Sequence, residues 1–127
     1  MPKPATGQPH PSGPRLRVVI EPDVAIGPGK ADLLEAIRDT GSISAAGRKL
    51  GMSYRRAWLL VDELNQHLGA PVIEAQTGGA KGGGAVLTAT GTEVLDRYRN
   101  MEEACREAIA GDVQALRNLI RRNQRQK

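Results

Sequence analysis

The segment 40–58 carries the start and stop signals of two consecutive helices. Ser42 and Ser44 can each accept a hydrogen bond from the free N–H groups of a first helical turn, so either residue can begin a short helix. Gly51 follows that helix, and glycine adopts the left-handed backbone of a helix end without steric cost. Ser53 is positioned to begin the next helix. This order of signals predicts a helix-turn-helix.

The second helix of this motif has two faces of different chemistry. Its apolar residues recur at helical spacing and form one face, made of Ala57, Leu60, Val61, Leu64 and Leu68. The opposite face carries Arg55, Leu59, Asp62 and Gln66. Tyr54 and Arg55 lie in the first turn, where a recognition helix in the major groove meets base edges. The pattern therefore indicates DNA binding.

Two short capped helices joined at a glycine also occur in helical proteins of every function, and adjacent arginines often form only a solvated face. The segment that follows favours DNA. The glycine-rich stretch 76–84 lies between two strand candidates, 72–75 and 85–87. A hairpin placed there is typical of a wing, in which glycine lets the backbone approach phosphate. Lys81 is the only charge in that stretch, so we expect it to contact phosphate.

A glycine-rich loop can alternatively hold the phosphates of a nucleotide. That kind of site requires a lysine followed by serine or threonine at the head of a helix. Here further glycines and a strand candidate follow Lys81. The sequence therefore disfavours nucleotide binding.

The N-terminal part of the chain predicts one small hairpin and one helix. Residues 1–14 are rich in proline and form a leader that we expect to be flexible. Strand candidates at 15–20 and 24–26 are separated by a turn. A break is expected at 27–29, and a helix at 30–39.

A long helix is predicted from Thr88 to about Ala110, with a break or kink at Gly111 and Asp112. Its apolar stripe continues beyond the break. The residues that we assign to dimerisation are Val94, Tyr98, Met101, Cys105 and Ile109. Three short helices cannot cover so long a stripe, so we expect a homodimer. The segment 121–127 is expected to be a basic, frayed tail.

Composition narrows the function further. The net charge of +4 favours a polyanionic partner. Cys105 is the only cysteine, and His10 and His67 lack metal-ligand spacing, so we expect no metal site. No Ser/His/Asp set or carboxylate pair suggests catalysis, so we expect no enzyme. No apolar run is long enough to cross a membrane and no signal peptide is recognisable, which favours the cytoplasm.

These residues together resemble a known family. Three strings carry the resemblance: Leu-Leu-Glu-Ala-Ile at 33–37, Thr-Gly-Ser-Ile-Ser-Ala-Ala at 40–46, and Gly-Met-Ser-Tyr-Arg-Arg-Ala-Trp at 51–58. With the glycine-rich wing, they are similar to the N-terminal domain of the ModE-like molybdate-responsive regulators. The resemblance covers about residues 15–105 and extends, more distantly, to LysR-type regulators.

The resemblance implies a dimeric transcription factor whose winged helix-turn-helix binds double-stranded DNA. It implies DNA contacts from Ser53, Tyr54, Arg55 and Arg56, and from Lys81 in the wing; Ser42 and Ser44 are added from the helix-turn-helix. It also implies dimerisation through the first and last helices. Trp58 is expected to pack in the core or at its edge.

Regulators of this family carry C-terminal domains that bind molybdate, and no such domain precedes Lys127. We therefore expect no cofactor, although a link to molybdate or other oxyanion metabolism is implied. The expected fold is mainly α with small β-hairpins, divided into a leader (1–14), a winged helix-turn-helix (15–88), a dimerisation helix (89–120) and a tail (121–127). The alternative function is a DNA-architectural or protein-docking module without an effector.

Overall fold

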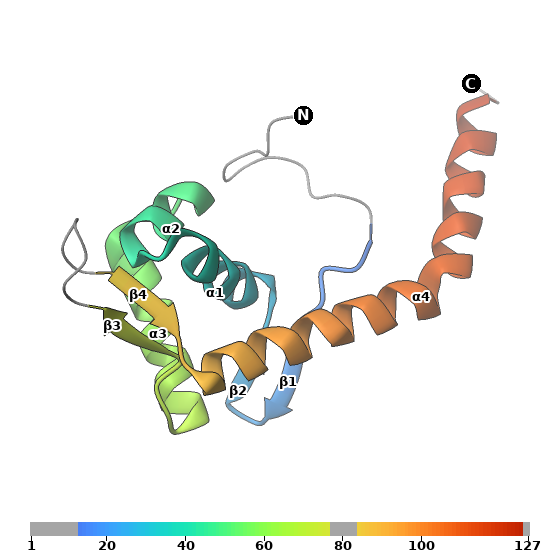
Figure 1. The fold of residues 1–127 in the computed structure, drawn as a ribbon. Helices are drawn as coiled ribbons and strands as arrows, with labels where there is room; N and C mark the ends of the chain where they lie inside the picture. The colour runs from blue at the N-terminus through green and yellow to red at the C-terminus, as the bar shows by residue number, and fades with distance from the viewer. Residues whose placement is uncertain (1–12, 77–83, 126–127) are drawn as a thin grey trace.

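The structure, a computed structural model, describes residues 13–76 and 84–125. Its elements are, in order, β1 (Val18–Glu21), β2 (Val24–Ile26), α1 (Pro28–Thr40), α2 (Ile43–Leu50), α3 (Tyr54–Leu68), β3 (Ile73–Gln76), β4 (Gly84–Leu87) and α4 (Ala89–Arg125). Helices α1–α3 and the β3–β4 hairpin gather at one end of the molecule, and α4 runs out from them (Figure 1). The predicted fold, a winged helix-turn-helix followed by a long helix, is confirmed.

The core is aliphatic and lies between α1, α2, α3 and the first half of α4. Its largest fully buried side chains are Leu33, Leu34, Ile37, Val61, Val72, Leu95 and Tyr98. Burying an aliphatic side chain of this size stabilises a fold by about 1.5–3 kcal/mol. Because the chain has no phenylalanine, close contact between helices carries most of the packing.

Tyr98 is the aromatic member of this core and corrects one prediction. The side chain is fully buried within the protomer, and its hydroxyl donates a hydrogen bond to the carbonyl oxygen of Leu16. Burial raises the pKa of Tyr98, with a further contribution from the charge of Glu102. A side chain with no exposed area cannot be buried by a second copy, so assigning Tyr98 to dimerisation was wrong.

The start of α1 also differs from the prediction. The helix begins at Pro28, inside the segment 27–29 that was expected to break the chain. Proline is tolerated there because the N–H groups of a first helical turn have no partner within the helix. Before it, β1 and β2 pair antiparallel, with Val18 opposite Ile26.

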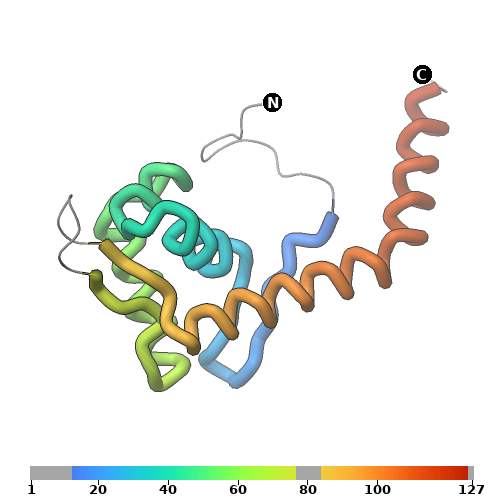
Figure 2. Tube along the Cα trace, in the orientation of Figure 1, coloured from blue at the N-terminus to red at the C-terminus, as the bar shows by residue number. Residues whose placement is uncertain are grey.

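Helix α4 is longer than predicted. It is helical through Gly111 to Arg125, so neither the break nor the frayed tail is present in the described residues. Its axis turns sharply in the C-terminal half, as the tube shows, which agrees with the kink that was the other alternative (Figure 2). Measured along its bent axis, a helix of 37 residues is about 55 Å long. Neither α4 nor any other described helix is apolar over a length that could cross a bilayer.

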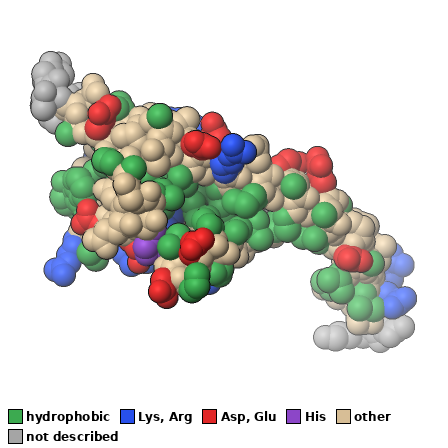
Figure 3. Space-filling view, turned by 90° about the horizontal axis from the view of Figure 1, so that it is seen from below, with side chains coloured by type: hydrophobic (Ala, Val, Ile, Leu, Met, Phe, Trp, Pro, Cys, Tyr) green, Lys and Arg blue, Asp and Glu red, His purple; other side chains and the backbone are tan. Residues whose placement is uncertain are grey.

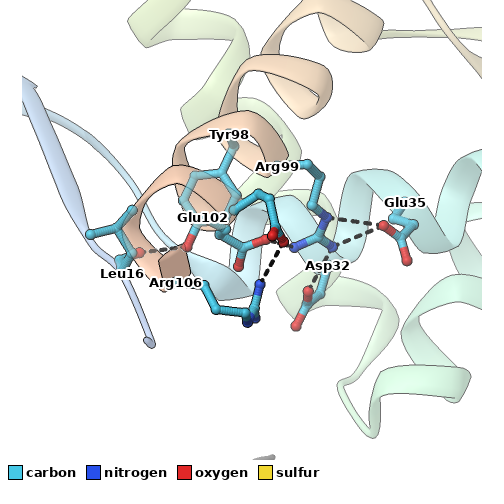
Figure 4. A network of polar contacts seen from close by, with 8 residues as sticks. Leu16, Asp32, Glu35, Tyr98, Arg99, Glu102 and Arg106 are labelled. Carbon is cyan, nitrogen blue, oxygen red and sulfur yellow. Dashed lines mark hydrogen bonds and ion pairs between the residues drawn. The ribbon is translucent and has the colours of Figure 1, made fainter. Parts of the chain in front are cut away.

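A charged cluster fastens α4 to α1 (Figure 4). Arg99 on α4 donates to Asp32 at 2.9 Å and to Glu35 at 3.0 Å, both on α1, and to Glu102 on its own helix at 2.8 Å. Burial alone would lower the pKa of Arg99, but the hydrogen bonds to Glu102 and Asp32 and the charge of Glu35 raise it above its ordinary value. Three carboxylates thus converge on one guanidinium.

Replacing Arg99 with methionine is expected to destabilise the protein by roughly 1–3 kcal/mol, because it leaves Asp32 and Glu35 facing each other without a cation. Urea unfolding followed by circular dichroism measures this loss. The matched control is Arg97→Met, which removes an exposed i,i+4 pair with Glu93 and is expected to cost less than 0.5 kcal/mol, about the value of such pairs. Equal losses in both variants would contradict the assigned role of Arg99.

A second junction joins Thr88, which directly precedes α4, to Pro71 and Val72, which directly precede the strand β3. The amide of Thr88 donates to the carbonyl oxygen of Val72 at 3.0 Å, and the hydroxyl of Thr88 donates to that of Pro71 at 2.7 Å. The same hydroxyl accepts from the amide of Gly91 at 3.0 Å. A Cβ atom on Gly91 would lie 2.1 Å from the Val72 oxygen, so only glycine permits this approach.

Candidate nucleic-acid interface

The helix-turn-helix is built by the caps that the sequence predicts. The hydroxyl of Ser42 accepts from the amide of Ala45 at 3.0 Å, and that of Ser53 accepts from Arg56 at 3.0 Å. Gly51 has a φ of 71°, in the left-handed region. Ser44 is not a cap: it lies inside α2 and accepts from the guanidinium of Arg48 at 2.9 Å. Both Ser42 and Ser44 therefore have partners within α2.

The outward face of α3 is the candidate DNA-contacting surface. The predicted inward face is confirmed, because Ala57, Leu60, Val61 and Leu64 are buried. Tyr54, Arg55, Arg56, Leu59, Asp62 and Gln66 are exposed. Among the described residues, no hydrogen bond or ion pair occupies the guanidinium of Arg55. This cation is available in the first turn of the helix, as a reader of base edges requires.

Trp58 lies at the flank of this face. It is 36% exposed and meets the ring of Tyr54 edge to face, with centroids 6.4 Å apart. The core position considered for Trp58 is therefore wrong, and packing at the edge of the core stays a prediction. Pairs of this geometry are worth about 0.5–1.5 kcal/mol, so each ring restrains the other on the helix surface.

The acidic residues of α3 do not present two negative charges to a polyanion. The carboxylate of Glu63 forms an ion pair with Lys30 of α1, with 2.7 Å between Oε1 and Nζ. The hydrogen bond and the charge of Lys30 lower the pKa of Glu63. Lys30 also donates to the carbonyl oxygen of Ala25. Asp62, on the outward face, is the acidic residue of α3 that has no ion-pair partner among the described residues, so one unpaired negative charge stands on this face.

The base of the predicted wing stands beside the helix-turn-helix. Strands β3 and β4 pair antiparallel, with Ile73 opposite Leu87 and Gln76 opposite Gly84. The amide of Ala85 donates to the carbonyl oxygen of Gly41 at 2.8 Å, which ties β4 to the turn between α1 and α2. A strand follows the glycine-rich stretch where a nucleotide-binding loop would require a helix. Lys81 lies outside the described residues.

The residues assigned to dimerisation divide into two groups. Val94 and Met101 pack against the protomer's own core, whereas Cys105 and Ile109 are half-buried on α4. Beyond them the apolar stripe continues over exposed side chains, with Leu116 59% and Ile120 56% exposed.

An apolar groove, which sequence reasoning missed, opens beneath α4. It has a volume of about 310 Å³ and lies between the β1–β2 hairpin, the end of α3 and the first half of α4. Its apolar lining includes Ile20, Val24, Leu64, Leu68, Val94 and Met101. Figure 3 shows hydrophobic side chains gathered along this side of the molecule. The groove joins segments far apart in the chain, so no local pattern signals it.

Known proteins share this sequence pattern. Residues 30–92 match the family described as bacterial regulatory helix-turn-helix protein, lysR family. The molybdenum-pterin-binding protein MopB of Rhodobacter capsulatus is 42% identical over 91 residues, which cover 72% of this chain and 34% of MopB. The molybdenum transport protein ModE of Azotobacter vinelandii is 32% identical over 117 residues, which cover 82% of this chain and 43% of that protein.

The DNA-binding transcriptional dual regulator ModE of Escherichia coli strain K12 is 36% identical over 91 residues, which cover 70% of this chain and 35% of the regulator. The chain thus spans less than half the length of these relatives. As expected, none of their names describes an enzyme.

A solved structure confirms the fold. The crystal structure of the CbnR DBD–DNA complex matches with a TM-score of 0.52 and 22% identity, and the match covers 71% of this chain and 95% of that one. The chain is therefore a ModE-like helix-turn-helix protein, and its residues 30–92 belong to the lysR family of bacterial regulatory helix-turn-helix proteins.

Proposed function

We propose that this protein is a cytoplasmic transcriptional regulator that binds double-stranded operator DNA with α3 in the major groove and the β3–β4 wing beside it. The observation that carries the proposal is the outward face of α3, which begins at the Ser53 cap and holds the unpaired guanidinium of Arg55 in its first turn. The relative in E. coli is a DNA-binding regulator, and the CbnR domain of similar fold was crystallised with DNA.

The protein binds its operator as a homodimer. The seam at Ile109, Val113, Leu116 and Ile120 has alternating spacings of four and three residues, which is the pattern of a coiled-coil interface. The groove beneath α4 adds apolar surface on the same helix. Pairing of two copies along α4 would set two recognition helices about 34–36 Å apart, one turn of DNA.

The regulated genes serve molybdate or other oxyanion metabolism. This assignment rests on the relatives, whose names describe molybdenum transport and molybdenum-pterin binding. Mapping of binding sites across the genome, with and without molybdate, tests it. Sites next to molybdenum transport genes are expected, and sites scattered without sequence preference would favour the architectural alternative.

Replacing Arg55 with alanine is expected to weaken binding to operator DNA by about 1–3 kcal/mol, because a bidentate contact to a guanine edge is lost. Preference at one base position should relax. Titration of the variant with an operator selected from random duplexes, and with random duplex, measures both effects. Arg106→Ala removes an equal charge from α4, where Arg106 pairs with Glu103, and should leave operator specificity unchanged. Equal losses on both DNAs would show that Arg55 contacts only phosphate.

A further inference from the structure

Three large hydrophobic side chains are exposed together on α3. Helices α1 and α2 expose no large hydrophobic side chain, whereas α3 exposes three: Tyr54 at 57%, Trp58 at 36% and Leu59 at 51%. A single exposed leucine carries little information, but a group of three on one helix marks a contact surface.

Leu59 lies on the outward face of α3, opposite the buried residues, and is 51% exposed. It follows Arg55 by four residues, so the two side chains stand on the same side of α3, about 6 Å apart along the helix axis. The rings of Tyr54 and Trp58 hold each other at the flank of the helix. An apolar contact and a hydrogen-bond donor thus lie side by side on the face opposite the buried residues.

The charges around this surface indicate a polyanionic partner with an apolar group at its centre. Arg55 and Arg56 stand beside Leu59 on α3, and Arg48 and Lys49 are exposed at the end of α2. Glu63 is neutralised by Lys30. In the major groove, the 5-methyl group of thymine is the apolar feature of the base edges.

We infer that Leu59 is a specificity-determining residue that reads the 5-methyl group of a thymine in the operator. This inference rests on the proposed function. Base pairs are spaced about 3.4 Å apart, so the thymine lies within about two base pairs of the guanine contacted by Arg55. The operator therefore contains a thymine next to, or one step removed from, that guanine.

Uracil lacks only the methyl group of thymine and provides the test. A duplex selected by the wild-type protein is first tested with Arg55→Ala, which locates the guanine. Each nearby thymine is then replaced singly by uracil, and the dissociation constant is measured for the wild type and for Leu59→Ala. One uracil should weaken wild-type binding about fourfold, the value of one buried methyl group. Leu59→Ala should bind the thymine and uracil duplexes equally.

Gln66→Ala is the control, because it truncates another exposed residue of the same face and should retain the uracil penalty. The inference is overturned if no uracil weakens binding by the wild type, or if the penalty persists in Leu59→Ala. If Leu59 instead contacts an apolar surface of another protein, no uracil should weaken binding of the wild type to DNA. Failure of the proposed function gives a different result, in which selection from random duplexes enriches no sequence.

Discussion

Replacing Gly91 with alanine is expected to destabilise the protein by about 2–4 kcal/mol. The added Cβ would lie 2.1 Å from the carbonyl oxygen of Val72, and that oxygen accepts the hydrogen bond from Thr88 which joins α4 to β3. The backbone must separate at this point, which costs packing and strains the hydrogen bond. Urea unfolding followed by circular dichroism gives the free energy of unfolding.

The same substitution elsewhere on α4 provides the control. Gly111 is exposed, and a Cβ atom there would meet no atom within 4 Å. Because alanine favours helix over glycine, Gly111→Ala should stabilise the protein by up to about 1 kcal/mol. Opposite signs for the two variants are the expected result. A stabilised Gly91→Ala variant would show that the close approach of α4 to Val72 is absent in solution.

Replacing Leu116 with aspartate is expected to convert the proposed homodimer to monomer. The side chain is 59% exposed in the protomer, so the substitution should leave the fold intact. An unpaired charge buried in the paired seam costs about 3–5 kcal/mol, or at least a hundredfold in dimer affinity. Sedimentation at micromolar concentration measures the change. Met101→Asp is a poorer test, because Met101 packs against the protomer's own core.

Asn118→Asp places the same charge on the opposite side of α4 and serves as the control. Its side-chain oxygen already accepts a hydrogen bond from Gln114 at 2.9 Å, and an aspartate oxygen can accept the same bond. This variant should stay dimeric, and circular dichroism should show unchanged helix content for both variants. A monomeric wild-type protein would contradict the homodimer, and a dimeric Leu116→Asp variant would contradict this seam.

Features that depend on a few consecutive residues could be predicted from the sequence. Ser53 begins α3 and Gly51 ends α2 as expected, because caps act within one helical turn. The inward and outward faces of α3 followed from helical periodicity for the same reason. Lys81 stays a prediction, since it lies outside the described residues.

Features that join distant segments could not be predicted. Periodicity placed Tyr98 on the apolar stripe of α4 but could not show that its hydroxyl meets Leu16. No local pattern distinguishes Arg99 from the other charges of α4, because Asp32 and Glu35 come to it from α1. Gly111 and Asp112 suggested a break or a kink, because glycine can end one helix and aspartate can begin the next. The helix continues there, since the cost of one glycine, about 1 kcal/mol, is small against the length of α4, and only the direction of its axis changes in this half.

Two junctions hold the first half of α4 in place. The one at Val72 holds it against the base of the wing, and the one at Arg99 holds it against α1. In the proposed homodimer, the length and the bend of α4 would set both the reach and the direction of the DNA-contacting surface. One inserted residue between Arg99 and the proposed seam would turn this surface by about 100°, away from the groove that it would face in that dimer. Seven residues would nearly restore its direction while moving it outward by about 10 Å, or three base pairs. If the proposed homodimer forms, the distance between operator half-sites would change only in discrete steps, set by the periodicity of the helix.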